Sequence, residues 1–173
     1  MRLAIFQKTT MLLKTLEKIE EFSVLEAEIL EIVNKHGNEY NQIMCQTLNE
    51  GSEDWLTGIG RIEELSEKEE TLYTHINPQL KGTLIEKYIL KYNAFRTRIL
   101  TIQPRHCYSV HPDPTARIHI PIKTDTQSWM VWPYHNVVKN LERKFVYWTD
   151  TRQPHTFFNG GTEPRIHLVM CVK

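Results

Sequence analysis

Cysteine is scarce in this sequence, and the few cysteines present follow no recognisable pattern. The 173 residues contain three, Cys45, Cys107 and Cys171, an odd number with no Cys-x-x-Cys pair. The pattern argues against a disulfide framework of the kind found in small secreted domains, and against a zinc knuckle. Thiols without disulfide partners fit a reducing compartment, so we expect a cytoplasmic protein.

The sequence also lacks net charge and long hydrophobic runs. Lys plus Arg and Asp plus Glu both number 21, which leaves no electrostatic reason to bind nucleic acid or an anionic membrane. The apolar run from Leu3 to Phe6 is cut by Lys8 and is too short for a signal peptide or a membrane span. We therefore expect no nucleic-acid or membrane partner. A small molecule, a small nucleotide included, and a peptide or protein side chain remain possible substrates.

No internal repeat, low-complexity tract or linker divides the chain, and its length fits one domain. The sequence therefore predicts a single domain over residues 1–173. Residues 1–95 would form a mixed buttress of helices and first strands, and residues 96–172 would form a β-rich core.

The first helix is predicted over residues 23–36. Ser23 and Glu26 have the spacing of a capping box, and an apolar stripe follows at helical intervals. Gly37 should end the helix. The preceding residues, 11–22, fit neither a helical nor a strand period cleanly.

A second helix is predicted over residues 78–93, with Asn77 as its N-cap and Pro78 in its first position. Between the two helices, residues 41–48 alternate as in a strand. The acidic run over residues 62–70 favours a solvated face, which is the usual role of such a run.

The C-terminal half changes to short alternating segments separated by turn residues. This pattern predicts a β-meander and favours a barrel or a sandwich. The expected strands cover residues 96–102, 129–132, 137–141 and 145–149.

Six of the eight histidines fall between His106 and His167, and two of them belong to a candidate metal site. His111 and Asp113 are two residues apart, so in an extended chain their side chains project to the same side. Joined by the distant His155, they would complete a two-His-one-carboxylate set, which holds Fe(II) and leaves coordination positions open.

Each of these residues also has an ordinary structural interpretation. A histidine in a β-rich region is more often a structural group than a ligand, and Asp113 before Pro114 could simply begin a turn. Arg165 could be a surface charge on the last strand. The combination of His-x-Asp, Arg-x-His, a distant His and a later Arg in one sequence favours the metal site.

This stretch resembles the Fe(II)/2-oxoglutarate-dependent oxygenases, and among them the aspartyl/asparaginyl β-hydroxylase-like group, which is also similar to free-proline hydroxylases. The matching pattern is His-x-Asp, Arg-x-His, a far His, and an Arg ten residues after it. Here those residues are His111, Asp113, Arg117, His119, His155 and Arg165.

The resemblance implies a mainly β fold, a double-stranded β-helix (a jelly-roll, cupin-like barrel) with N-terminal helices packed outside. It implies that His111, Asp113 and His155 bind iron. Arg165 would pair with the far carboxylate of 2-oxoglutarate, and Arg117 and His119 would touch the same cosubstrate.

The reaction implied by the resemblance is hydroxylation of a C–H bond with O2. The substrate would be an amino acid or a protein side chain such as Asp, Asn or Pro, and succinate and CO2 would be the co-products. Two alternatives remain open. One is a cupin-like metal enzyme that does not use 2-oxoglutarate, and the other is a non-catalytic barrel that only binds a ligand.

The Asn159-Gly160-Gly161 sequence predicts a turn and is typical of a hairpin. Such a hairpin would fold the strands on either side together. It would bring Arg165 beside His155, with His167 on the same strand face.

Overall fold

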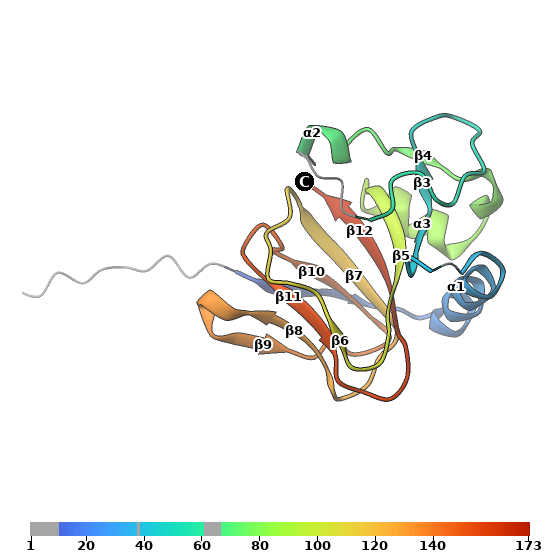
Figure 1. Ribbon diagram of the computed structural model, residues 1–173. Coiled ribbons are helices and arrows are strands. Elements are labelled where there is room, and N and C mark those ends of the chain that lie inside the picture. Colours follow the sequence, from blue (N-terminus) through green and yellow to red (C-terminus); the bar gives the residue numbers. More distant parts are fainter. Residues whose placement is uncertain (1–10, 38, 61–66) are drawn as a thin grey trace, which may run out of the picture.

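The computed structural model describes residues 11–37, 39–60 and 67–173 and consists mainly of antiparallel strands (Figure 1). The larger sheet contains, in spatial order, β1 (Leu13–Lys18), β10 (Phe145–Thr149), β7 (Ala116–Lys123), β12 (Arg165–Val172), β5 (Phe95–Ile102) and β2 (Gln42–Met44). The smaller sheet contains β6 (His106–Cys107), β11 (Thr156–Asn159), β8 (Ser128–Trp132) and β9 (Val137–Lys139). A third, two-stranded sheet pairs β3 (Gln46–Thr47) with β4 (His75–Ile76).

The helical segments come from the N-terminal half, with one exception. They are α1 (Phe22–His36), α2 (Glu67–Glu70), the 3-10 turn η1 (Pro78–Leu80), α3 (Leu84–Lys91) and a second 3-10 turn, η2 (Pro133–His135). None of the helices among the described residues has the length and apolarity needed to cross a membrane. The apolar run from Leu3 to Phe6 lies outside the described residues.

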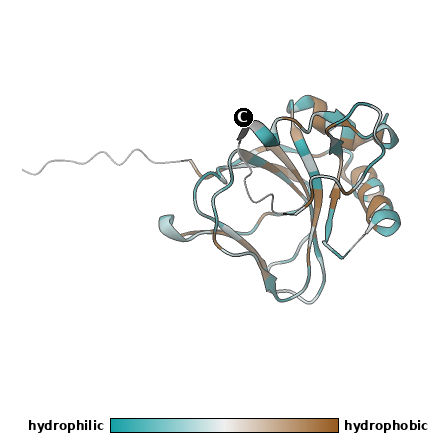
Figure 2. Ribbon diagram, turned by 45° about the horizontal axis from the view of Figure 1, so that its top comes forward, coloured by the Kyte–Doolittle hydropathy of each residue, from teal (hydrophilic) through white to brown (hydrophobic). Residues whose placement is uncertain are grey.

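The larger sheet has one hydrophobic face and one polar face, because side chains alternate along each strand. The hydrophobic face packs against α1 and α3, which lie beside it in Figure 1. In Figure 2, hydrophobic stretches run along these strands and helices, whereas the loops are mostly hydrophilic. The hydrophobic cluster between this face and the two helices includes Leu25 and Ile29 of α1, Ile85 and Ile89 of α3, Ile118 and Ile120 of β7, and Leu168 and Met170 of β12.

A second hydrophobic cluster joins the two main sheets. It contains Leu12, Ile102, Met130, Trp132, Leu141, Tyr147 and Phe157. Trp132 is fully buried, and its Nε1 donates a hydrogen bond to the Asp150 carbonyl at 3.1 Å. The polar face of the larger sheet therefore faces the smaller sheet across a partly hydrophobic interior.

The first helix ends at the predicted residue, but it begins one residue earlier and without the predicted cap. Glu21 is its N-cap and makes no side-chain capping bond, so Ser23 lies inside the first turn and the predicted capping box was wrong. The end is as expected: the Gly37 amide donates to the Val33 carbonyl at 2.9 Å. The ambiguous stretch before this helix contains β1, which pairs with β10 at the edge of the larger sheet.

The second predicted helix is divided in two. Asn77 caps as expected, with its Oδ1 accepting from the Gln79 amide at 3.0 Å, but it begins only the short turn η1. Gly82 then adopts a φ of +81°, which a right-handed helix cannot include. Thr83 caps α3 anew, accepting from the Glu86 amide at 3.2 Å.

The predicted strands of the C-terminal half are present, but residues 41–48, predicted as one strand, form β2 and β3 in different sheets. Two of the predicted connections were also wrong. β10 leaves the meander and pairs with β7 in the larger sheet, whereas β8 and β9 pair in the smaller one. Likewise, β11 and β12 belong to different sheets and form no hairpin. The cause is the buried side chain of Asn159, which accepts from the Gly161 amide and donates to the Ile102 and Glu163 carbonyls. These bonds build a loop that crosses between the sheets.

Candidate metal centre

The three candidate ligands are held by main-chain hydrogen bonds between two segments that lie outside the long strands. His111 and His155 form an isolated antiparallel bridge, in which each amide donates to the other's carbonyl at 3.0 Å. Two residues further on, the Asp113 amide donates to the Thr151 carbonyl at 2.8 Å. Residues far apart in the sequence are thereby fixed side by side.

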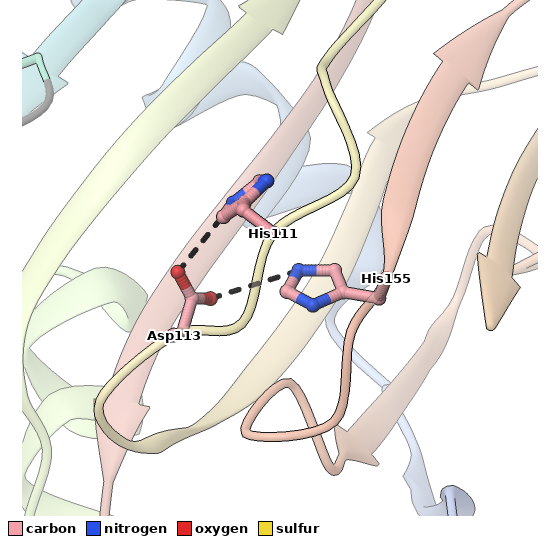
Figure 3. A group of neighbouring side chains, drawn as sticks. All are labelled: His111, Asp113 and His155. Carbon is pink, nitrogen blue, oxygen red and sulfur yellow. Dashed lines mark ion pairs between the residues drawn. The ribbon is translucent and has the colours of Figure 1, made fainter. Parts of the chain in front are cut away.

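The side chains of these residues converge (Figure 3). His111 Nε2 lies 3.6 Å from Asp113 Oδ1, and His155 Nε2 lies 3.7 Å from Asp113 Oδ2. One donor atom from each residue lies within 4.8 Å of the others. Within the part of the chain that the structure describes, no other group of three His, Cys, Asp or Glu side chains has this arrangement.

The hydrogen bonds of the two imidazoles leave the correct nitrogen available for a metal. His111 Nδ1 donates to the Ser109 carbonyl at 2.7 Å, and His155 Nδ1 donates to the Gln153 carbonyl at 3.1 Å. Each ring therefore presents the lone pair of Nε2 toward Asp113. Burial also lowers the pKa of His155 below its ordinary value of 6.5, against the opposing effect of Asp113, which favours the neutral ligand form. Two imidazoles and one carboxylate match the donor set that Fe(II) takes in facial sites.

A cavity of about 660 Å³ adjoins these three residues. Its wall is unusually rich in arginine for a buried surface, because four arginines of the larger sheet's polar face contribute to it. They are Arg96, Arg98, Arg117 and Arg165. The cavity is large enough for two small ligands beside a metal.

Two of these arginines, Arg96 and Arg117, share the Glu70 carboxylate. Its carboxylate is fully buried and accepts from Arg96 Nη1 at 3.0 Å and from Arg117 Nη2 at 2.6 Å. Thr115 Oγ1 donates to the same carboxylate at 2.6 Å. Arg117 Nε also lies 3.4 Å from Asp113 Oδ2, so a chain of charges links α2 to the candidate metal ligand.

This cluster bears on two sequence-based expectations. The acidic run was predicted to be a solvated face, and for Glu70 that prediction was wrong, since the carboxylate has buried cationic partners; Glu63 and Glu64 lie outside the described residues. Arg117 was expected to touch the cosubstrate, and this stays a prediction. Its guanidinium contacts Glu70, Thr115 and Asp113, and the residue also lines the cavity.

Arg165 has a different environment. It is 3% exposed, lines the cavity, and has no carboxylate within ion-pairing distance among the described residues. Its guanidinium carbon lies 3.4 Å from the centroid of the Phe157 ring, and its Nη2 donates to His167 Nδ1 at 2.6 Å. Nε has no partner. Burial lowers the pKa of Arg165 to about 9. A buried cation without a counter-ion is costly, which indicates a site prepared for an anion.

His119 and His167 complete this part of the wall. The His119 ring is buried, and neither of its nitrogens has a hydrogen-bond partner in the described chain. Its ring centroid lies 5.8 Å from those of Phe157 and His167. Burial, and then the charge of Arg165, hold the pKa of His119 and of His167 well below 6.5. Both rings are therefore neutral hydrogen-bonding groups at neutral pH.

Sequence reasoning missed Glu70 and Arg98. Glu70 is indistinguishable from its acidic neighbours in the sequence, and only the fold places it beneath two arginines. Arg98 did carry a signal. It stands two residues after Arg96 in a strand that otherwise contains only apolar residues and threonine, and in an extended chain this spacing places both cations on one face.

Neither a protein-family model nor a curated protein matches this chain. Solved structures do. A truncated viral collagen prolyl hydroxylase from Paramecium bursaria Chlorella virus-1 aligns with a TM-score of 0.54 at 10% identity, covering 94% of this chain and 91% of the viral one. An oxidoreductase of the 2OG-Fe(II) oxygenase family from Burkholderia pseudomallei aligns with a TM-score of 0.54 at 14% identity, covering 92% and 82%.

A third similar structure is AviO1 from Streptomyces viridochromogenes Tue57, with a TM-score of 0.51 at 11% identity and coverage of 92% and 88%. At these identities the likeness concerns the fold. The expectation of a mainly β fold with flanking helices is confirmed at this level, while closure of the two sheets into a barrel remains a prediction. The chain has the fold of proteins that include 2OG-Fe(II) oxygenases.

Proposed function

We propose that this protein is an Fe(II)- and 2-oxoglutarate-dependent dioxygenase that hydroxylates a C–H bond of an amino acid or of a protein side chain. The observation that carries the proposal is the pairing of two features in one cavity. His111, Asp113 and His155 present a facial donor set, and Arg165 presents a buried cation without a counter-ion. Such an oxygenase needs both.

In this proposal His111 Nε2, His155 Nε2 and one Asp113 oxygen hold Fe(II), which when bound supplies the O2 chemistry. Arg165 pairs with the far carboxylate of 2-oxoglutarate, whose planar, bidentate shape suits a guanidinium. The neutral His119 ring, with both nitrogens unpartnered, offers the same cosubstrate a hydrogen bond. Phe157 stacks on Arg165, which fixes the guanidinium and keeps water from it.

The substrate side is supported by the similarity to a collagen prolyl hydroxylase and by the residue pattern shared with the aspartyl/asparaginyl β-hydroxylase-like group. Both suggest an amino-acid side chain such as Pro, Asp or Asn. The alternative, a cupin-like metal enzyme without 2-oxoglutarate, would leave Arg165 buried without a ligand. A non-catalytic barrel would leave the open metal positions without a purpose.

The proposal is tested by incubating the protein with Fe(II), ascorbate, O2 and labelled 2-oxoglutarate, and by measuring labelled CO2 and succinate. Even without a primary substrate we expect slow decarboxylation in the wild type and none in Asp113→Ala. In parallel, the Mn(II)-loaded protein should bind 2-oxoglutarate in calorimetry. Metal binding without 2-oxoglutarate binding or turnover would favour the cupin-like alternative, and neither activity would favour the non-catalytic barrel.

A further inference from the structure

Arg98 is a second buried cation of the cavity wall without a carboxylate partner among the described residues. It lies on β5, is 8% exposed, and lines the same cavity as the candidate metal ligands. Its Nη1 donates to the Gln42 side-chain oxygen at 3.2 Å, and its Nε has no hydrogen-bond partner in the described part of the chain. One neutral acceptor cannot balance a buried guanidinium, and burial lowers the pKa of Arg98 to about 10.

The charges around the cavity show that Arg98 is not needed by the known parts of the site. Glu70 and Asp113 face Arg96 and Arg117, so these four groups balance one another. Arg98 and Arg165 remain uncompensated. A bound Fe(II) and a bound 2-oxoglutarate dianion would cancel each other, so the loaded site would still carry excess positive charge. A further anionic ligand is the group that would balance it.

Arg98 and Arg165 also occupy different parts of the wall. On paired strands β12 and β5, Arg165 lies opposite Ile102 and Val169 lies opposite Arg98. Four residues at roughly 3.4 Å per residue separate the two positions by about 14 Å along the strands. The surroundings differ as well, because Arg98 is influenced by the charges of Arg96, Arg117 and Asp113, none of which acts on Arg165. Arg98 therefore belongs to the side of the cavity near the metal ligand Asp113.

We propose that Arg98 is the anion-binding residue for the primary substrate, and that this substrate carries a carboxylate close to the C–H bond that is oxidised. The inference rests on the proposed oxygenase function and adds a substrate class to it. The Arg98 guanidinium would form a bidentate pair with the carboxylate, while Gln42 orients the guanidinium from behind. The carboxylate can be the α-carboxylate of a free amino acid or the acidic side chain of a peptide.

The test uses full-length protein loaded with Mn(II) and saturated with 2-oxoglutarate, so that Arg165 is already occupied. Two ligand series are titrated by calorimetry. The first compares each free amino acid with its α-amide, and the second compares N-acetyl amides of Asp and Glu with those of Asn and Gln. The wild type, Arg98→Met and Arg165→Met are compared, since methionine keeps the bulk of the arginine stem without its charge.

We expect at least one carboxylate ligand to bind the wild type thirtyfold or more tightly than its amide. Arg98→Met should abolish that preference while keeping 2-oxoglutarate affinity within twofold, and Arg165→Met should lose 2-oxoglutarate. The series in which the preference occurs identifies the source of the carboxylate.

Equal binding of carboxylates and amides to the wild type, or a preference that survives in Arg98→Met, would overturn the proposal. Loss of 2-oxoglutarate in Arg98→Met would also overturn it, by assigning Arg98 to the cosubstrate. Failure of the wild type itself to bind 2-oxoglutarate would instead refute the oxygenase function on which the proposal rests.

Discussion

The four arginines of the cavity wall fall into two pairs with opposite electrostatic environments. Arg96 and Arg117 share the buried Glu70 carboxylate, whereas Arg98 and Arg165 have no carboxylate partner among the described residues. All four are buried on the same face of one sheet. Although residue type and burial are the same, the difference predicts that the first pair stabilises the fold and that the second pair binds ligands.

The largest effect on stability is expected for the pair that has a carboxylate partner, Arg96 and Arg117. Glu70→Ala would leave the buried Arg96 without a counter-ion and Arg117 with only Asp113, which should lower the free energy of unfolding by about 3–5 kcal/mol. Urea denaturation measures this loss, with the exposed Glu31→Ala as the control, expected to change stability by about 0.5 kcal/mol or less. Similar stabilities of the two variants would remove the distinction between the pairs.

The pair without a carboxylate partner, Arg98 and Arg165, is tested by measuring ligand binding to variants of Arg165. Removing one partner of a buried charge pair costs roughly 2–5 kcal/mol, so Arg165→Ala should weaken 2-oxoglutarate binding by about thirtyfold or more. Arg165→Lys should recover only part of the affinity, since lysine is a point charge without the planar fork. Calorimetry on Mn(II)-loaded protein measures both. Unchanged Mn(II) affinity is the required control, and equal 2-oxoglutarate affinity in all three proteins would remove Arg165 from the site.

The pH dependence of stability reports on the histidines beside Arg165. In the folded protein the pKa values of His119 and His167 lie well below 6.5, so these rings stay neutral while the unfolded chain takes up protons. Folding stability should therefore be fully present above pH 6.5 and should fall as pH decreases below it. The slope is about 1.4 kcal/mol per pH unit for each histidine. Urea unfolding at pH 7.5 and 5.5 measures this slope, and His167→Gln should reduce it. An unchanged slope in that variant would contradict a buried neutral ring.

The smallest expected effect is a change in the stability of the ligand-free protein, and its sign differs between the two pairs of arginines. Arg98→Met and Arg165→Met remove charges without counter-ions, so each should raise the stability of the ligand-free protein by roughly 0.5–2 kcal/mol. Arg96→Met removes a partner of Glu70 and should lower it. Thermal unfolding of the three variants at one pH gives the comparison. Destabilisation by all three would show that Arg98 and Arg165 also serve the fold.

The spacing of His111 and Asp113 and the pattern linking them to His155 identified in advance the three side chains that the structure brings together. This was possible because a local rule places the first two on one side of the chain, and the far residue is marked by its type. The interpretation of these residues as iron ligands remains a prediction.

Long-range arrangement was less accessible from the sequence. The Asn159-Gly160 signal indicated a hairpin, but the Asn159 side chain is buried and bonded to the Ile102 and Glu163 carbonyls, contacts that no local pattern encodes. Glu70 similarly gains its role from strands that follow it by more than 20 residues. Turn propensities and charge runs describe neighbours in sequence, whereas these two residues are determined by neighbours in space.

The link from Glu70 through Arg117 to Asp113 has a consequence for how this protein can be divided. A fragment that begins at β5 would retain every candidate metal ligand. It would nevertheless lack β1 and β2, the two edge strands of the larger sheet, and the only carboxylate that neutralises Arg96 in the described chain. The N-terminal half therefore supplies a counter-charge to the C-terminal half, because without Glu70 the buried Arg96 would lose its carboxylate partner and Arg117 would retain only Asp113.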